Sequence, residues 1–203
     1  DDDFCAKAFP GDHVQVVAAA EARRDESSPH ASWKELLQHL DQAYEFDRVV
    51  YLSNYLTPHT DTVGDIETLR SVFRACAGRR IQLLYVAGPA GAEGAADAAG
   101  RTGKGIIAHA ANDLCRYYAA REGVQTKILR VPFLYTASAA LEDPFLVPLF
   151  DACSTGSVAL QGAQDAAFPL LCAEELAVLV CRIFDSWDAS FETLDVADTF
   201  HHA

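Results

Sequence analysis

The sequence predicts a three-layer α/β fold, in which helices cover both faces of a mostly parallel sheet. Two observations lead to this class. Short apolar runs, such as the β-branched run at 48–53 and the run at 81–86, alternate with longer segments whose apolar residues recur at helical spacing. The chain has 203 residues, 50% of them hydrophobic, which is enough for one domain with a buried core and too apolar for wholesale disorder. Strands that alternate with helices are typical of βαβ units, whose crossovers are nearly always right-handed.

The individual elements follow from local patterns. The run 14–18 is predicted to be a short strand, and 32–44 is predicted to be a helix that begins with a capping box. A helix over 65–77 has one apolar stripe and ends at Gly78. The remaining predicted elements, in chain order, are a strand at 81–86, a loop rich in Gly and Ala at 88–103, a helix at 106–122 ended by Gly123, a strand at 126–131 ended by Pro132, a short helix within 144–153, a strand at 157–160, a helix at 173–187 and a strand at 191–196.

The charge balance excludes some classes of partner. The chain has 16 Lys and Arg residues and 29 Asp and Glu residues, which gives a formal charge of −13. Nucleic acids and anionic membranes favour basic surfaces, so we expect neither as a partner. No apolar run approaches the ~20 residues that span a bilayer, and the N-terminus does not resemble a signal peptide. The chain has no Met and begins Asp1-Asp2-Asp3, so Asp1 need not be the natural start of the polypeptide.

The six cysteines favour a reducing compartment and no metal site. No two form a C-x-x-C pair, and Cys76, Cys115 and Cys181 lie among apolar residues of predicted helices, where they are expected to be small buried hydrophobes. His109 and Asp113 are spaced i, i+4, which more often indicates a surface pair than a metal site. We therefore expect a cytoplasmic protein without a bound metal.

Three stretches together resemble one family. The helix 114–123 is followed by the strand Thr126–Val131, which ends in Leu-Arg at Arg130, and then by Tyr135. Two further stretches, 168–177 and 47–53, resemble a strand-then-helix element and the fourth strand of the same fold. In this order they are similar to the extended short-chain dehydrogenase/reductases, the NAD-dependent epimerase/dehydratase group that acts mostly on nucleotide sugars. The resemblance covers about 14–198 and implies a single Rossmann-like domain with tails at 1–13 and 199–203.

The residues that carry the chemistry in that family have no counterparts here. Only about 45 residues precede the fourth-strand match, so the N-terminal Gly-rich βα unit is expected to be absent or severely shortened. Ala87 or Gly88 occupies the place of the family's catalytic Ser. The family's Tyr-x-x-x-Lys pair falls on Lys104 and Ala108, and a register shifted by two gives Thr102 and Ile106 instead. We therefore predict no catalytic residue.

Candidate binding residues follow from strand ends. In open parallel sheets ligands bind outside the carboxyl ends of the strands. This rule and the resemblance select, as the candidate cofactor-binding set, Ser53, Asn54, Ala87, Gly88, Arg130 and Pro132. For Ser53 and Asn54, a turn or capping role before Pro58 is the favoured alternative. Any cofactor is expected to be NAD(P), and any further ligand a nucleotide or nucleotide sugar.

A glycine-rich pattern follows the predicted strand at 81–86. The segment Gly88–Gly94 spells G-x-x-G-x-x-G after a predicted strand, as a phosphate-binding loop would. The residues directly behind it include no large apolar side chain that could pack a helix on the sheet. A flexible or lid-like loop is therefore the favoured interpretation.

Three functions remain open from the sequence. The first is a degenerate, non-catalytic domain that serves a structural, regulatory or ligand-sensing role in a longer protein. The second is a divergent NAD(P)-dependent epimerase or dehydratase whose cofactor-binding unit lies outside this chain. The third is an interaction module, either fused to a partner domain or paired as a homodimer through the helices 65–77 and 106–122, as the resemblance implies.

Overall fold

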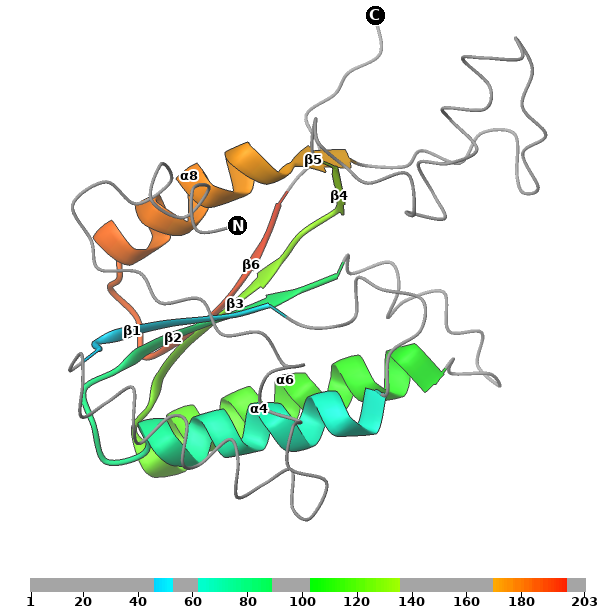
Figure 1. The fold of residues 1–203 in the computed structure, drawn as a ribbon. Helices are drawn as coiled ribbons and strands as arrows, with labels where there is room; N and C mark the ends of the chain where they lie inside the picture. Colours follow the sequence, from blue (N-terminus) through cyan, green and yellow to red (C-terminus); the bar gives the residue numbers. More distant parts are fainter. Residues whose placement is uncertain (1–45, 53–61, 89–102, 136–169, 197–203) are drawn as a thin grey trace, which may run out of the picture.

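A parallel four-stranded sheet forms the centre of the protein. The computed structural model describes residues 46–52, 62–88, 103–135 and 170–196 (Figure 1). The strands β1 (Arg48–Leu52), β2 (Gln82–Ala87), β3 (Gln125–Arg130) and β6 (Phe191–Asp195) lie in the order β1-β2-β3-β6, and every neighbouring pair is parallel. The predicted parallel sheet is therefore confirmed.

Helices cover both faces of this sheet. The helices α4 (Thr62–Cys76) and α6 (Gly103–Glu122) lie side by side on one face, and α8 (Ala173–Asp185) lies on the other (Figure 1). The predicted three-layer arrangement is thus confirmed. Gly78 and Gly123, which follow α4 and α6, have φ values of 75° and 68°. This left-handed conformation suits glycine and ends a helix, as the sequence indicated.

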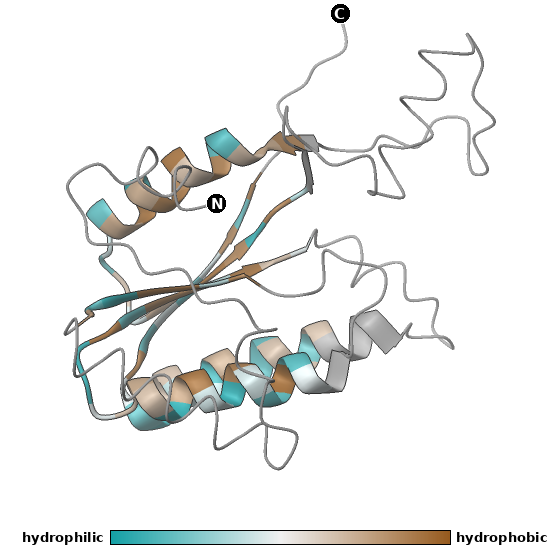
Figure 2. Ribbon diagram, in the orientation of Figure 1, coloured by the Kyte–Doolittle hydropathy of each residue, from teal (hydrophilic) through white to brown (hydrophobic). Residues whose placement is uncertain are grey.

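Each face of the sheet has its own apolar core, because successive side chains of a strand point to opposite faces. Leu83, Tyr85 and Ile128 pack with α4 and α6, whereas Leu84 and Leu129 pack with α8. Figure 2 shows the apolar colouring concentrated on the strands and on the sheet-facing sides of the helices. The central strand β2 is buried on both faces from Leu83 to Ala87, which explains why this stretch is a continuous apolar run.

The crossover through α8 differs from the two before it. The strands advance in one direction across the sheet, from β1 to β6. The connections through α4 and α6 pass over one face, but α8 lies on the opposite face. This connection therefore has the opposite hand to the first two, an exception to the uniform right-handed winding expected from general rules.

A second, two-stranded parallel sheet is formed by β4 (Phe133–Tyr135) and β5 (Leu170–Cys172). The resemblance indicated a strand near β5, but β4 was not predicted. Three residues are too few to show a periodicity, and the pairing is non-local. The predicted elements at 14–18, 32–44, 144–153 and 157–160, and most of the loop 88–103, lie outside the described residues.

Candidate functional site

Three strand ends define the carboxyl edge of the sheet. In the backbone register Ala87 of β2 lies opposite Arg130 of β3, which lies opposite Asp195 of β6. The amide of Val131 donates a hydrogen bond of 2.9 Å to the carbonyl of Ala87, and the amide of Val196 donates one of 3.0 Å to that of Arg130. Continuous pairing up to the last residue therefore holds these side chains in a fixed row.

Small and apolar residues occupy the middle of this edge. Ala87, Gly88 and Pro132 are all buried. None of the three has a side-chain group that can donate or accept a proton. At the position where general acid–base chemistry would need a hydroxyl or carboxyl group, β2 thus offers only a methyl group and a hydrogen atom.

Arg130 and Asp195 are charged residues at this edge. Their side chains are 21% and 59% exposed, and a guanidinium nitrogen of Arg130 lies 3.7 Å from a carboxylate oxygen of Asp195. This separation exceeds ordinary hydrogen-bond length, so the contact is a loose ion pair on neighbouring strands. The edge therefore presents a cation whose charge is partly balanced by a carboxylate.

The six candidate residues from the sequence separate into two groups. Ala87, Gly88, Arg130 and Pro132 lie together at the carboxyl edge, as expected from their strand ends. Ser53 and Asn54 lie outside the described residues, directly after the end of β1 at Leu52. Whether any of the six binds a cofactor remains a prediction.

The start of α6 holds the positions that the family resemblance assigns to a catalytic pair. Lys104 and Ala108 fall in the first two turns of this helix. They are the positions that the family resemblance assigns to the Tyr and Lys of its catalytic pair. The alternative register assigns Ile106, also in α6, and Thr102, which lies outside the described residues. Neither register supplies a Tyr or a Lys at the required place.

A polar contact between β1 and α4 was not predicted from the sequence. The hydroxyl of Tyr51 donates a hydrogen bond of 2.6 Å to Oδ1 of Asp65, and Asp65 is only 4% exposed. The ring of Tyr51 also stacks on that of Tyr85, with the ring centres 5.9 Å apart. Asp65 stands in the first turn of α4, where a carboxylate is favourable. The bond ties the start of α4 to β1.

Replacing Tyr51 with Phe is expected to lower the free energy of unfolding by about 1–3 kcal/mol, because it removes a hydrogen bond to a buried carboxylate. Urea unfolding followed by circular dichroism would measure the loss. Tyr117→Phe provides a control with the same chemical change at a position that is 53% exposed. Equal losses in the two variants would contradict a structural role for the Tyr51 bond.

The cysteines in the cores are unsuited to nucleophilic chemistry. Cys76 and Cys115 are fully buried, and burial raises the pKa of the Cys76 thiol to about 12 and that of Cys115 still further. A thiol with so high a pKa is not ionised near neutral pH. Both are small core residues, as the sequence indicated, whereas Cys181 is half-buried rather than buried. Cys172, directly before α8, is also half-buried and donates to the carboxylate of Glu174.

The described segments contain neither a cluster of metal ligands nor a helix that could span a membrane. Within the described segments, no three or more His, Cys, Asp or Glu side chains gather as a metal site would require. His109 and Asp113 are both exposed on α6. In the same segments, no helix has the length and apolar character needed to cross a bilayer.

Known proteins resemble the chain in structure but not in sequence. No protein-family model matches the sequence, and no curated protein is significantly similar to it. Among solved structures, UDP-N-acetylglucosamine 4-epimerase from Bacillus cereus superposes with a TM-score of 0.61 at 17% identity, over 81% of this chain and 60% of that enzyme. UDP-glucuronic acid 4-epimerase from the same organism, in complex with NAD, gives a TM-score of 0.63 at 13% identity, over 79% and 56%.

A third match extends the group to a dehydratase. The dTDP-glucose 4,6-dehydratase from Bacillus anthracis, in complex with NAD, has a TM-score of 0.61 at 12% identity, over 80% of this chain and 55% of the enzyme. The chain thus spans between half and two thirds of the length of these proteins. At such identities the likeness concerns the fold, and at that level it confirms the resemblance to the extended short-chain dehydrogenase/reductases. The chain has the Rossmann-like α/β fold of the nucleotide-sugar epimerases and dehydratases.

Proposed function

We propose that this chain is a degenerate epimerase/dehydratase-like domain that does not catalyse the family's reaction and serves as a regulatory, ligand-sensing or interaction domain. The observation that carries the proposal is the end of β2, where the buried Ala87 and Gly88 occupy the place of the family's catalytic Ser. Lys104 and Ala108 at the start of α6 add to it, because they replace the acid–base pair.

The ligand proposed for this domain is a nucleotide or a nucleotide sugar. Two of the similar enzymes were solved with NAD, which gives the class of molecule that this fold accommodates in those proteins. In the present chain, Arg130 at the carboxyl edge supplies a cation suited to a phosphate group. The carboxylate of Asp195 reduces that attraction, so the proposed binding is weaker than at an unopposed arginine.

The chain is expected to show no NAD(P)-dependent turnover of UDP-glucose, UDP-N-acetylglucosamine or dTDP-glucose, because no side chain at the end of β2 can exchange a proton with a substrate. Nicotinamide absorbance and sugar analysis by chromatography would measure turnover. The UDP-N-acetylglucosamine 4-epimerase from B. cereus, assayed in parallel, serves as the positive control. Turnover by the isolated chain that depends on added NAD(P) would overturn the non-catalytic assignment.

Binding can be tested separately from catalysis. A ligand that prefers the native state raises the thermal midpoint, so a scan with NAD, NADP, UDP and UDP-sugars distinguishes a ligand-sensing domain from a scaffold. Arg130→Gln is expected to abolish any midpoint rise caused by a phosphate-bearing ligand. The rise would persist in Arg182→Gln, which removes an exposed arginine of α8.

A second candidate is a divergent epimerase or dehydratase whose cofactor-binding unit lies outside this chain. The observation that favours it is that the chain spans only 55–60% of the length of the similar enzymes. Activity that appears only when the chain is joined to such a unit would support it over the first proposal. A single domain, a homodimer through α4 and α6, and a fused partner domain all remain predictions. Light scattering, which measures the molar mass in solution, tests the homodimer.

A further inference from the structure

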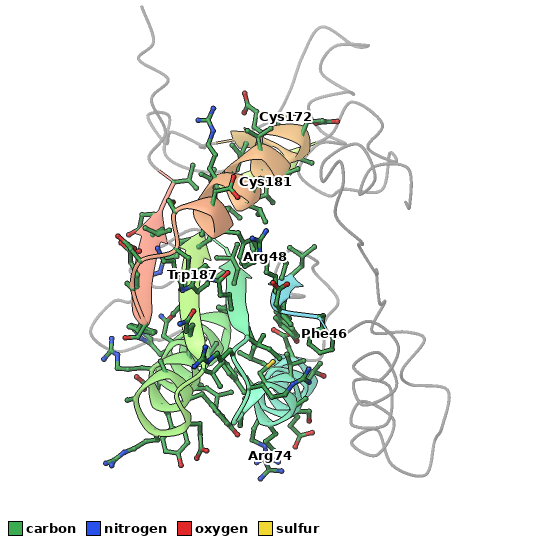
Figure 3. The ribbon with its side chains drawn as sticks, turned by 90° about the vertical axis from the view of Figure 1, so that its left-hand side faces the viewer. Phe46, Arg48, Arg74, Cys172, Cys181 and Trp187 are labelled. Atoms are coloured by element: carbon green, nitrogen blue, oxygen red, sulfur yellow. The ribbon has the colours of Figure 1, made fainter. Side chains whose placement is uncertain are left out.

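The first and last strands of the four-stranded sheet differ in the side chains that they expose. Among the described residues β1 pairs only with β2 and β6 only with β3, so these strands lie at the two ends of the row (Figure 3). β6 exposes Thr193 and Asp195, and polar or charged residues discourage the addition of a further strand. β1 instead exposes the apolar side chains of Val50 and Leu52, which are 39% and 59% accessible. Of the two strands, β1 is therefore the one suited to further pairing.

The hydrogen bonds between β1 and β2 show which backbone groups of β1 point outward. The amide of Gln82 in β2 donates a hydrogen bond of 2.9 Å to the carbonyl of Asp47, although its register partner is Arg48. In a parallel pair, a residue that faces its neighbour bonds to the two residues that flank its register partner, and the backbone groups of that partner point the other way. Alternation along the strand therefore directs the amide and carbonyl groups of Arg48, Val50 and Leu52 away from β2.

The side chains of these three residues share one face of the sheet. All three are exposed, whereas Val49 and Tyr51, which alternate with them, pack against the core under α4 and α6. The three exposed side chains therefore lie on the face that carries α8, because side chains alternate along a strand. The guanidinium of Arg48 lies 5.4 Å from the centre of the Phe184 ring of α8 (Figure 3). Within the described residues, the apolar core beneath α8 includes no residue of β1.

We propose that β1 is a self-association strand, at which two copies of this chain join their sheets antiparallel across a two-fold axis at Val50. In this register Val50 lies opposite Val50 of the second copy, and Arg48 lies opposite Leu52. Residues that point their backbone groups toward the other strand then face one another directly, and such opposed residues exchange both of their hydrogen bonds. The strand is thus complementary to itself, and the pairing extends the sheet without disturbing the bonds between β1 and β2.

The side chains also favour a second copy as the occupant. Val50 would pack on its own counterpart, and the aliphatic stem of Arg48 would lie along Leu52 of the second copy. The two guanidinium groups stay at opposite ends of the paired strands, so like charges do not face one another across the axis. The net charge of −13 on each copy opposes association at longer range, and salt screens this repulsion. We therefore expect a weak dimer that becomes stronger as the salt concentration rises.

Sedimentation velocity of the full chain over about a hundredfold range of concentration tests the proposal. We expect the mass to rise from one chain toward two, and to rise further between about 50 and 500 mM salt. Val50→Pro should abolish the dimer, because it removes an amide that points away from β2, a position where an edge strand tolerates proline. Thr193→Pro makes the same kind of change on β6 and should leave the dimer intact. Its amide also points outward, because Val196 donates to the carbonyl of Arg130 and the direction alternates along β6.

A pair of opposite charges at the axis tests the register. Val50→Lys and Val50→Glu should each be monomeric, because like charges would then lie directly opposite one another. An equimolar mixture of the two variants should form the dimer, because a lysine then faces a glutamate. Both substitutions are at an exposed position and should leave the fold intact, which circular dichroism checks. A mixture that stays monomeric would show that Val50 does not lie opposite itself.

Two further results would overturn the proposal. The first is a chain that stays monomeric at every concentration and salt, as it would if another segment of the same chain occupied β1. The second is a dimer that persists in Val50→Pro but is lost in Tyr117→Glu, which would place the contact on α4 and α6. None of these outcomes depends on whether the carboxyl edge binds a nucleotide.

Discussion

Replacing Phe73 with Ala is expected to lower the free energy of unfolding by about 3–5 kcal/mol, the usual cost of removing a buried aromatic side chain. Phe73 is 0% exposed and lies between α4 and the sheet. Its ring is nearly parallel to that of Tyr118, with an angle of 7° between the planes. Such a stacked pair contributes about 0.5–1.5 kcal/mol beyond the burial of its area.

This loss is large because domains of this size are only marginally stable. A typical total of about 5–15 kcal/mol leaves little reserve after such a substitution. Urea unfolding measured by circular dichroism gives the change, provided that the slope with denaturant is unchanged. Phe73→Leu keeps most of the volume and should cost about 1–2 kcal/mol, which keeps the test informative if the Ala variant does not fold.

Tyr117→Ala is the matched control for Phe73. It removes an aromatic side chain from the same helix layer, but at a position that is 53% exposed. Its cost should stay below about 1 kcal/mol, because solvent already covers half of the ring. A loss below about 1 kcal/mol for Phe73→Ala, or equal losses at both positions, would show that the contact between α4 and α6 contributes little to stability.

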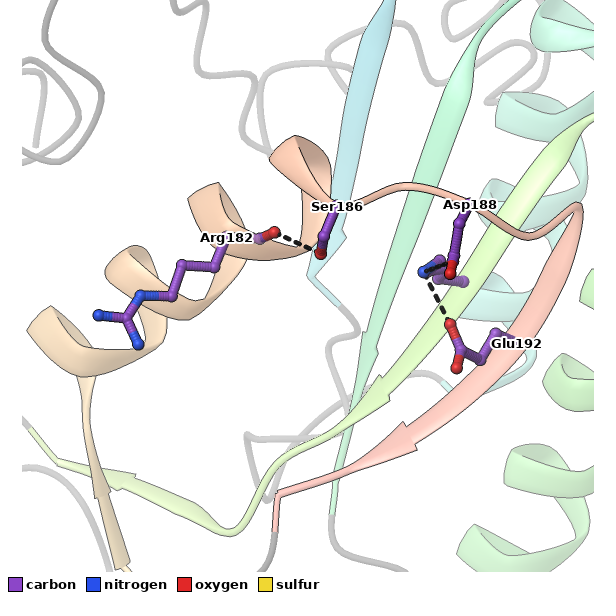
Figure 4. A network of polar contacts seen from close by, with 5 residues as sticks. Arg182, Ser186, Asp188 and Glu192 are labelled. Atoms are coloured by element: carbon purple, nitrogen blue, oxygen red, sulfur yellow. Dashed lines mark hydrogen bonds and ion pairs between the residues drawn. The ribbon is translucent and has the colours of Figure 1, made fainter.

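We expect the second large loss of stability when the two acids that pair with Lys127 are removed. Lys127 of β3 is buried, with its side chain 4% exposed, and its Nζ lies 2.7 Å from Glu192 and 3.2 Å from Asp188 (Figure 4). The ammonium also lies 5.4 Å from the centre of the Trp187 ring. The double variant Asp188→Ala with Glu192→Ala should lower the free energy of unfolding by more than either single substitution, because it removes both ion-pair partners of the Lys127 ammonium.

Replacing Lys127 itself, in place of its two acids, should cost far less stability. Lys127→Met keeps the length of the side chain, removes the buried charge and leaves an apolar chain against Trp187. The two acids that remain are 84% and 39% exposed and can be solvated by water. We therefore expect a loss below about 1.5 kcal/mol, or a gain. A larger loss for Lys127→Met than for the double acid variant would contradict this account.

The same cluster gives a pH dependence with a definite sign. Burial lowers the pKa of Lys127, but hydrogen bonds to Glu192 and Asp188 and their charges outweigh this and raise its pKa above the usual value of 10.5. Because the folded-state pKa is the higher one, the stabilisation is fully present below about pH 10.4 and is lost as the pH rises through the folded-state pKa. Denaturation titrations should show this alkaline decline in the parent chain and a smaller one in Lys127→Met.

Asp188 makes the stability depend on pH at acidic values as well. Its hydrogen bond with Lys127 is the main reason why its pKa is lowered below the usual 3.8. A depressed carboxylate pKa stabilises the native state above the unfolded value, and the effect is lost as the pH falls through the folded value.

Much of the fold could be predicted from the sequence because the signals are local. The run Val49-Val50-Tyr51 is β-branched, the run Ile81–Val86 is largely apolar, and the predicted strands and helices that fall on the described residues agree with the structure to within a few residues at each end. The strand ends also fixed which residues share the carboxyl edge, since parallel strands all end on the same side. The absence of an acid–base group at Ala87 likewise follows from the order of residues alone.

The tertiary structure decided the features that depend on distant neighbours. The sequence does not reveal that Asp65 lies within hydrogen-bond distance of Tyr51, or that Lys127, in a buried strand, is held by two acids some 60 residues further along the chain. It predicts helices on both faces of the sheet, but it does not say that α8 is the helix on the face opposite α4 and α6. The chain's local patterns thus determine its elements and the chemistry missing from β2. Only packing brings residues far apart in sequence together, and packing therefore decides which charges are paired and which face the solvent.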